Sequence, residues 1–184
     1  NVNSDADAKS FSFLKSYNFI KDGTTKFKMK IAKQFDSEEW TAEIKTNLFA
    51  NTINLDFLEY EKEKNVRAEL SGIFYFKENN LKSIKSMKFY SEDILFDSNV
   101  IFDEDMEIKK VDIKEFISSK NNIYGSVDFK EDTRYFNLKG SSIDIKEFLT
   151  SENKKFNNLI FELDVSNLFY GDLVFGKSQI ITHI

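Results

Sequence analysis

Apolar and polar residues alternate along most of this chain, and this pattern predicts β-strands with one buried face and one wet face. Phe27, Met29 and Ile31 alternate with lysines, while Phe161 and Leu163 alternate with acidic residues. The chain contains no proline, so no residue denies a backbone N–H to a sheet ladder. We therefore expect an all-β fold, mainly antiparallel, in which a long twisted sheet curls into an open groove or half-barrel with minor short helices.

Two similar segments, Asp112–Ile117 and Asp144–Leu149, are the main candidates for helical structure. Each begins with an aspartate that is positioned to cap a short helical turn, and each then places an isoleucine and a phenylalanine three residues apart on one face. Residues 81–88 fit a short helical crossing and a strand equally well. Helical content is therefore expected to be small.

Polar residues mark the expected breaks between strands. Asp22 and Gly23 predict a hairpin turn, and the segment Lys62–Asn65 is typical of a solvated turn. Where a β-bulge resets the register, the buried face of a strand changes parity, and Gly72 and Gly125 are the expected places for such bulges.

The chain of 184 residues has no Pro-rich or Gly/Ser-rich linker, so residues 1–184 are expected to form a single β-rich segment. Its first residue, Asn1, is not an initiator methionine, and residues 178–184 are apolar-rich rather than loop-like. We expect the chain to be a fragment excised from a larger protein.

The composition argues against most kinds of chemistry. There is no cysteine, which excludes disulfides, thiolate metal sites and cysteine nucleophiles. The one histidine, His183, lies near the end of the chain and is a poor candidate for a catalytic base or a metal ligand. A net charge of −5 argues against nucleic acid as a partner. We expect no enzyme activity, no catalytic or metal-binding residues and no cofactor.

The acidic residues of the segment Asp97–Asp105 have some of the oxygen density of a calcium-binding loop. The segment lacks the glycine, the ligand spacing and the terminal glutamate of an EF-hand. Other carboxylates follow the wet side of strands and do not converge as a glycosidase requires. A closed β-sandwich or barrel, either structural or binding a ligand such as carbohydrate or calcium, is the alternative interpretation.

From about residue 27 onward, the order of features resembles the β-rich repeat region of large AsmA-like proteins of Gram-negative bacteria, specifically the DUF3971 region of YhdP-type proteins. The resemblance is carried by Trp40–Ile44, Asn47–Leu58, Ala68–Phe76, Phe136–Leu149 and Phe161–Leu168. Its most specific part is the phrase from Gly140 to Asp144. The chain departs from the family in lacking prolines and in its denser glutamate and lysine.

This resemblance implies a repeating β-groove segment in the periplasmic part of a protein that is anchored in the inner membrane. It also implies a non-enzymatic role in outer-membrane homeostasis and in phospholipid transport between the inner and outer membranes. The partners would be phospholipid acyl chains, which can lie along a continuous apolar strand face because they need no hydrogen bonds.

One parity of the alternating strands is expected to face the groove and contact lipid, while polar residues such as Arg67 and Glu69 face water. The expected lipid-facing residues are Phe27, Met29, Ile31, Trp40, Ile44, Leu70, Phe74, Phe76, Val127, Phe129, Phe136, Leu138, Phe161 and Leu163.

Overall fold

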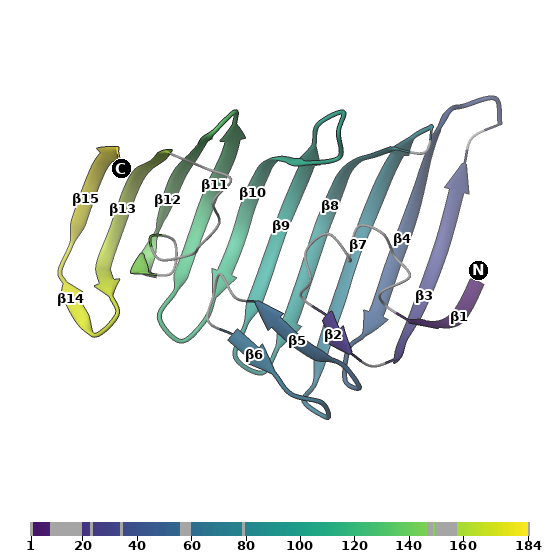
Figure 1. Cartoon of the computed structure of the whole chain (residues 1–184), viewed down its shortest axis with the longest axis horizontal. Coiled ribbons are helices and arrows are strands. Elements are labelled where there is room, and N and C mark those ends of the chain that lie inside the picture. The colour runs from purple at the N-terminus through teal and green to yellow at the C-terminus, as the bar shows by residue number, and fades with distance from the viewer. Residues whose placement is uncertain are drawn as a thin grey trace.

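A computed structural model of the chain describes residues 2–7, 20–22, 24–33, 35–55, 60–78, 80–146, 149 and 158–183. The described residues confirm the all-β expectation, because most of them belong to strands and the sheet they form does not close into a barrel (Figure 1). Within these ranges, no helix has the length and apolar character needed to cross a membrane.

Twelve strands form one large sheet, in which most strands that follow each other in sequence are also neighbours in space. All pairings are antiparallel except that of β12 with β13, which is parallel. The strands in sheet order are β1 (Val2–Asp7), β3 (Thr24–Lys33), β4 (Glu39–Asn47), β7 (Ala68–Lys77), β8 (Asn80–Ser91), β9 (Leu95–Phe102), β10 (Ile108–Ile117), β11 (Asn122–Lys130), β12 (Thr133–Asp144), β13 (Asn158–Tyr170) and β14 (Leu173–Phe175), with β15 (Ser178–His183) also paired to β13.

A second, three-stranded sheet is formed by β2 (Ile20–Asp22), β5 (Thr52–Leu55) and β6 (Tyr60–Lys62). It interrupts the large sheet in sequence, since β5 and β6 lie between β4 and β7. The hairpin predicted at Asp22 is therefore wrong: β2 pairs with β5, whereas β3 pairs with β1 and β4.

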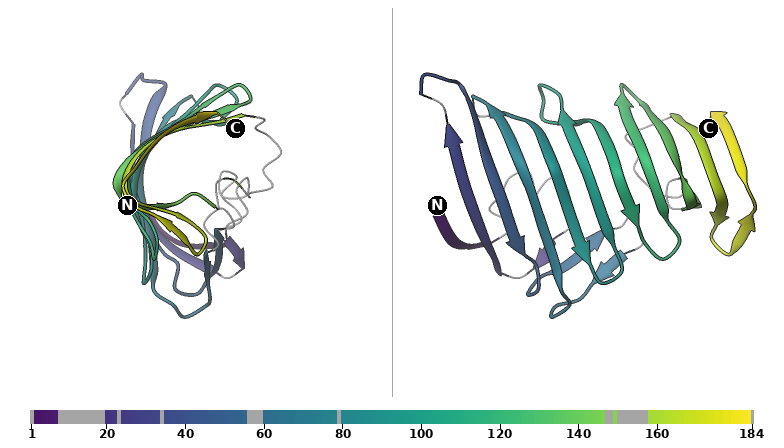
Figure 2. Two further views of the ribbon diagram at one scale, coloured as in Figure 1. Left: turned by 90° about the vertical axis from the view of Figure 1, so that its left-hand side faces the viewer. Right: turned by 180° about the vertical axis from the view of Figure 1, so that it is seen from behind.

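The large sheet is strongly curved and has a C-shaped cross-section when it is viewed along its length (Figure 2). Register shifts explain this curvature because they recur at matching heights on neighbouring strands, where each extra residue bends its strand. One shift lies at Gly72, opposite Ser86 and Met87, and another follows Ile113, next to Gly125. Register shifts thus occur beside both predicted positions, but the extra residues belong to the partner strands β8 and β10 and not to the strands of Gly72 and Gly125. We call this series of shifts the bend line.

Glycines permit the closest approach of strands along the bend line. A Cβ atom at Gly125 would collide with the backbone oxygen of Asn137, and one at Gly140 would collide with that of Asn122. Gly125 also has a φ of 140°, which L side chains rarely adopt. These two positions on β11 and β12 therefore require glycine.

The two similar Asp-Ile-Lys-Glu-Phe segments adopt different structures. The first, from Asp112, lies inside β10, so the helical turn expected there is wrong. The second begins at the end of β12, where the Oδ1 of Asp144 accepts a hydrogen bond from the N–H of Lys146 at 3.0 Å and the N–H of Leu149 donates to the Ile145 oxygen. A short capped turn is confirmed there, and residues 81–88 are resolved as strand.

Candidate functional site

One face of the large sheet carries rows of mostly apolar side chains that run across the strands in register. The first row is unbroken from β3 to β13, and each of its members is the register partner of the next. It consists of Ile31, Ala42, Phe74, Ile84, Val100, Val111, Val127, Phe136 and Phe161. A neighbouring row begins with Phe27, Thr46, Leu70, Phe89, Phe96, Phe116 and Ile123. We call this surface the apolar face.

The part of the apolar face nearest the β3–β4, β7–β8 and β9–β10 turns forms a hydrophobic cluster. Among the described residues, only strands β3 to β10 of the large sheet contribute to it. We call it the single-layer cluster, because within the described part of the chain no residue of another layer belongs to it. Its members are the buried Ala42, Phe74, Leu81, Ile84, Val100 and Phe102, together with the half-buried Met29, Trp40, Ile44, Phe76, Met87, Ile108 and Val111.

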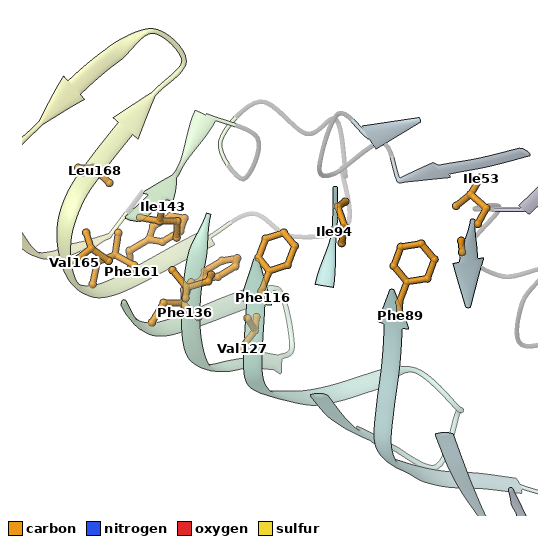
Figure 3. Packing of buried hydrophobic residues seen from close by; sticks show 14 of the residues in the cluster. Ile53, Phe89, Ile94, Phe116, Val127, Phe136, Ile143, Phe161, Val165 and Leu168 are labelled. Carbon is orange, nitrogen blue, oxygen red and sulfur yellow. The ribbon is translucent and has the colours of Figure 1, made fainter. Parts of the chain in front are cut away.

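The rest of the apolar face packs against other elements, and we call this region the two-layer cluster. On the sheet side its buried members include Phe89, Phe116, Val127, Phe136, Leu138, Phe161 and Leu163. On the other side it receives Ile53 from β5 and the turn residues Ile145 and Leu149. Figure 3 shows Ile53 across from Phe89, and Phe136 stacks on Phe161 with ring centroids 4.5 Å apart. This part has the packing of an ordinary protein core.

The register places all the residues predicted to contact lipid on the apolar face, but the structure divides them. Met29, Trp40, Ile44, Phe74 and Phe76 belong to the single-layer cluster. The two-layer cluster contains Leu70, Val127, Phe129, Phe136, Leu138, Phe161 and Leu163. Phe27 is buried at 9% exposure and Ile31 is open at 53%. Contact of these side chains with lipid stays a prediction.

Sequence reasoning missed Arg134, which lies on the apolar face between two apolar neighbours. Its register partners are Phe129 on β11 and Leu159 on β13, and its guanidinium carbon lies 5.8 Å from the centroid of the Phe129 ring. Burial lowers the pKa of this guanidinium, because a low-dielectric environment disfavours the charged form. The signal was present, since Arg134 shares the parity of Phe136 and Leu138.

A depression of about 450 Å³ adjoins the single-layer cluster at its β3–β4 end, and no sequence pattern indicated it. It is lined by Ile31, Lys33, Ser37, Glu38, Trp40 and Glu78. The indole of Trp40 stacks on Phe76 with ring centroids 3.9 Å apart and an interplanar angle of 5°. Its Nε1–H donates to the Glu78 backbone oxygen at 2.8 Å, and the Glu78 N–H donates to the Glu38 oxygen at 2.8 Å. These contacts fix the indole between two turns.

The turn that follows β6 is not solvated at Lys62, contrary to the sequence expectation. This side chain is 2% exposed, and its ammonium group donates to the backbone oxygens of Asn51, Glu63 and Val66 at 2.7, 2.8 and 3.1 Å. Burial lowers the pKa of Lys62, while the three carbonyl acceptors favour its charged form. Lys62 thus ties the small sheet to the chain segment that enters β7.

The acidic segment 97–105 does not form a single site. Asp97 forms ion pairs with Lys88 at 3.1 Å and Lys114 at 3.7 Å. Asp103 lies in the next turn, where its Oδ1 accepts hydrogen bonds from the N–H groups of Asp105 and Glu107. Across the described ranges, no three Asp, Glu or His residues are grouped so that they could hold a metal ion. His183 lies in β15.

The convex face is polar, and Glu69 is an example. It forms ion pairs with Arg67 at 3.3 Å and with Lys45 at 3.4 Å. The hydrogen bond from Arg67, followed by the charge of Lys45, lowers the pKa of Glu69.

No protein-family model, curated protein or solved structure matches this chain.

Proposed function

We propose that the chain is a non-enzymatic lipid-binding segment and that acyl chains bind along the single-layer cluster. The observation that carries this proposal is a row of apolar partners that crosses the sheet while, within the described ranges, its upper part has no second protein layer. An apolar sheet face must be covered by something, because water is a poor neighbour for it. In this proposal a lipid tail covers the half-buried margin of the cluster, which includes Trp40, Ile44 and Phe76.

The dimensions and chemistry of the cluster suit an acyl chain. Neighbouring strands lie about 4.8 Å apart, so the run from β3 to β10 is roughly 24 Å wide, which approximates an extended phospholipid tail. Each buried CH₂ group contributes about 0.8 kcal/mol without requiring a hydrogen bond. A tail can therefore bind firmly while no single position along the row holds it in place.

The resemblance to AsmA-like proteins supports a wider setting for this activity. In that setting the chain is a periplasmic part of an inner-membrane-anchored protein that takes part in phospholipid transport between the two membranes of the cell envelope. The C-shaped cross-section gives the large sheet a concave face, and such a role requires a curved face of this kind (Figure 2).

Site-specific photocrosslinking tests the binding proposal. A benzophenone side chain at Phe76 or Ile44, both half-buried in the single-layer cluster, should form adducts with phospholipid from vesicles of phosphatidylethanolamine and phosphatidylglycerol. The matched control is Glu43, which is exposed on the same strand as Ile44 and points to the opposite face. Absence of adducts at both apolar positions in folded protein, or equal labelling at Glu43, contradicts the proposal.

A closed structural β-domain is the second candidate, and the two-layer cluster favours it. Leu138, Phe161 and Leu163 are 1%, 2% and 3% exposed, so the chain's own side chains already fill this region. The centre of the single-layer cluster is similarly buried, with Phe74 and Val100 at 2% and 3% exposure, so space for a lipid is confined to its half-buried margin. If the whole apolar face behaves in this way, a probe at Phe76 gives no lipid adduct, and the protein retains no phospholipid after purification from cells.

A further inference from the structure

The depression beside Trp40 lies where a bound tail would leave the single-layer cluster. Trp40 belongs to that cluster and also lines the depression, so the two surfaces are continuous. Ile31 and Lys33 on β3 form part of its lining, which places it near one end of the row of strands from β3 to β10. The polar headgroup of a lipid must lie at such an end, because its charges cannot enter the apolar row without a large desolvation cost.

The lining of the depression contains both signs of charge. Lys33 provides an ammonium group, while Glu38 and Glu78 provide two carboxylates, and all three residues are exposed. A headgroup with a single negative charge would meet two carboxylates there. A zwitterionic headgroup, which has a phosphate and an ammonium group, finds an opposite charge for each of its own.

The aromatic ring adds a second recognition element. Phe76, on the β7 side of β4, covers one face of the indole, and Lys33 is the register partner of Trp40 on the β3 side. The second indole face therefore lies on the β3 side, next to Lys33, and Trp40 and Lys33 both line the depression. The face of a tryptophan ring attracts ammonium and quaternary ammonium groups. The ring is also held in place by its hydrogen bond to the Glu78 oxygen.

The geometry points to this depression as a binding site for the headgroup of a zwitterionic phospholipid, such as an ethanolamine or choline lipid. The ammonium group packs on Trp40 near Glu38 and Glu78, and the phosphate pairs with Lys33. The assignment rests on the proposed acyl-chain site, and it gives the bound lipid a direction, with its headgroup at β3–β4 and its tail extending toward β10.

Trp40 is the only tryptophan in the sequence, so intrinsic fluorescence reports on this position alone. Phosphatidylcholine labelled with a nitroxide on the choline, or with one at the end of the acyl chain, is bound to the protein, and free vesicles are removed. The headgroup label should quench Trp40 at least threefold more strongly than the tail label. Equal or stronger quenching by the tail label overturns the inference but leaves the acyl-chain site intact.

Phosphorus analysis of the same isolated complexes separates the two proposals. If no phospholipid remains with the wild-type protein, the acyl-chain site itself is refuted, and the headgroup site falls with it. If phospholipid is bound but the headgroup label does not quench Trp40, only the headgroup assignment is wrong.

Charge variants provide an independent check with lipids of identical tails. Glu38→Gln combined with Glu78→Gln should weaken phosphatidylcholine binding about fivefold, as expected for exposed cation–π and ionic contacts, and should not weaken phosphatidylglycerol binding. Lys33→Gln should weaken both phospholipids and leave diacylglycerol, which lacks phosphate, unchanged. Glu43→Gln is the control, since Glu43 is exposed on the convex face. An unchanged preference between the two phospholipids in the double variant overturns the inference.

Discussion

The two hydrophobic clusters of this protein are made from the same kind of strand, yet they differ in what faces them. The two-layer cluster receives Ile53 and the turn residues Ile145 and Leu149, whereas all described members of the single-layer cluster come from one sheet. Alternation of apolar and polar residues is identical in both. The comparison teaches that this pattern determines which face of a strand is apolar but carries no information on what covers that face.

The largest effect is expected from truncating the two-layer cluster. Phe161→Ala removes a ring that is 2% exposed and stacked on Phe136, so it should lower the free energy of unfolding by about 4 kcal/mol. Urea denaturation measures this loss. Phe76→Ala in the single-layer cluster should cost clearly less, because that ring is only half-buried. Equal losses would show that the two clusters are packed alike.

Replacement of Lys62 should selectively destabilise the second layer. Lys62→Met leaves the oxygens of Asn51, Glu63 and Val66 without their shared donor, and we expect a loss of about 3 kcal/mol. Hydrogen exchange should then accelerate in β5 and β6 before it changes in β8 and β9. Lys64→Met, at an exposed lysine of the same turn, is the control. Uniform acceleration over the whole chain would contradict a separate second layer.

A charge introduced into the single-layer cluster should weaken lipid binding more than it lowers the stability of the fold. Ile44→Glu places a carboxylate among the bound tails, which should weaken lipid binding by about 2 kcal/mol, whereas the half-buried position limits the loss of stability. Lipid retention and urea denaturation are measured on the same preparation. Glu43→Lys on the opposite face should change neither. A stability loss as large as that of Phe161→Ala would assign Ile44 to a closed core.

The smallest effect on stability is expected from a substitution on the convex face, which belongs to neither cluster. Because the pKa of Glu69 is lowered in the folded state, the folded protein binds its proton less readily than the unfolded chain does. Its contribution to stability is therefore present above pH 4.5 and is lost as the pH falls through the lowered pKa. Glu69→Gln should remove this acid-side dependence and leave lipid binding unchanged. Added salt should have a similar effect, because these groups are exposed.

The sequence was sufficient to predict the fold class, the apolar parity and the bulges near Gly72 and Gly125. It was insufficient where two similar segments met different surroundings. Asp112 and the residues after it are paired with β9 on one side and β11 on the other, and these ladders outweigh a cap of about 1 kcal/mol. Asp144 ends its strand, and its carboxylate there accepts a hydrogen bond from the N–H of Lys146 and caps a turn. Long-range pairing decided both outcomes, and neither local pattern contains it.

The candidate site was predictable to a similar degree. The alternating residues indicated the apolar face, but the depression beside Trp40 joins Lys33 and Glu38 to Glu78, which comes from a later turn. The burial of Lys62 likewise depends on carbonyl groups from both sides of the small sheet. Such sites are assembled from turns that lie far apart in the sequence, so the alternation of apolar and polar residues does not reveal them.

The bend line has a consequence for how a protein of this kind can evolve. The curvature is built into the strand pairs from β7–β8 to β11–β12 by their register shifts, at Gly72 and Met87, after Ile113 and near Gly140, and not by closure between the ends of the sheet. The width of the trough is therefore set locally, while its length is set by the number of hairpins. Gain or loss of a pair of strands through a duplication or deletion would lengthen or shorten the trough and leave its cross-section unchanged.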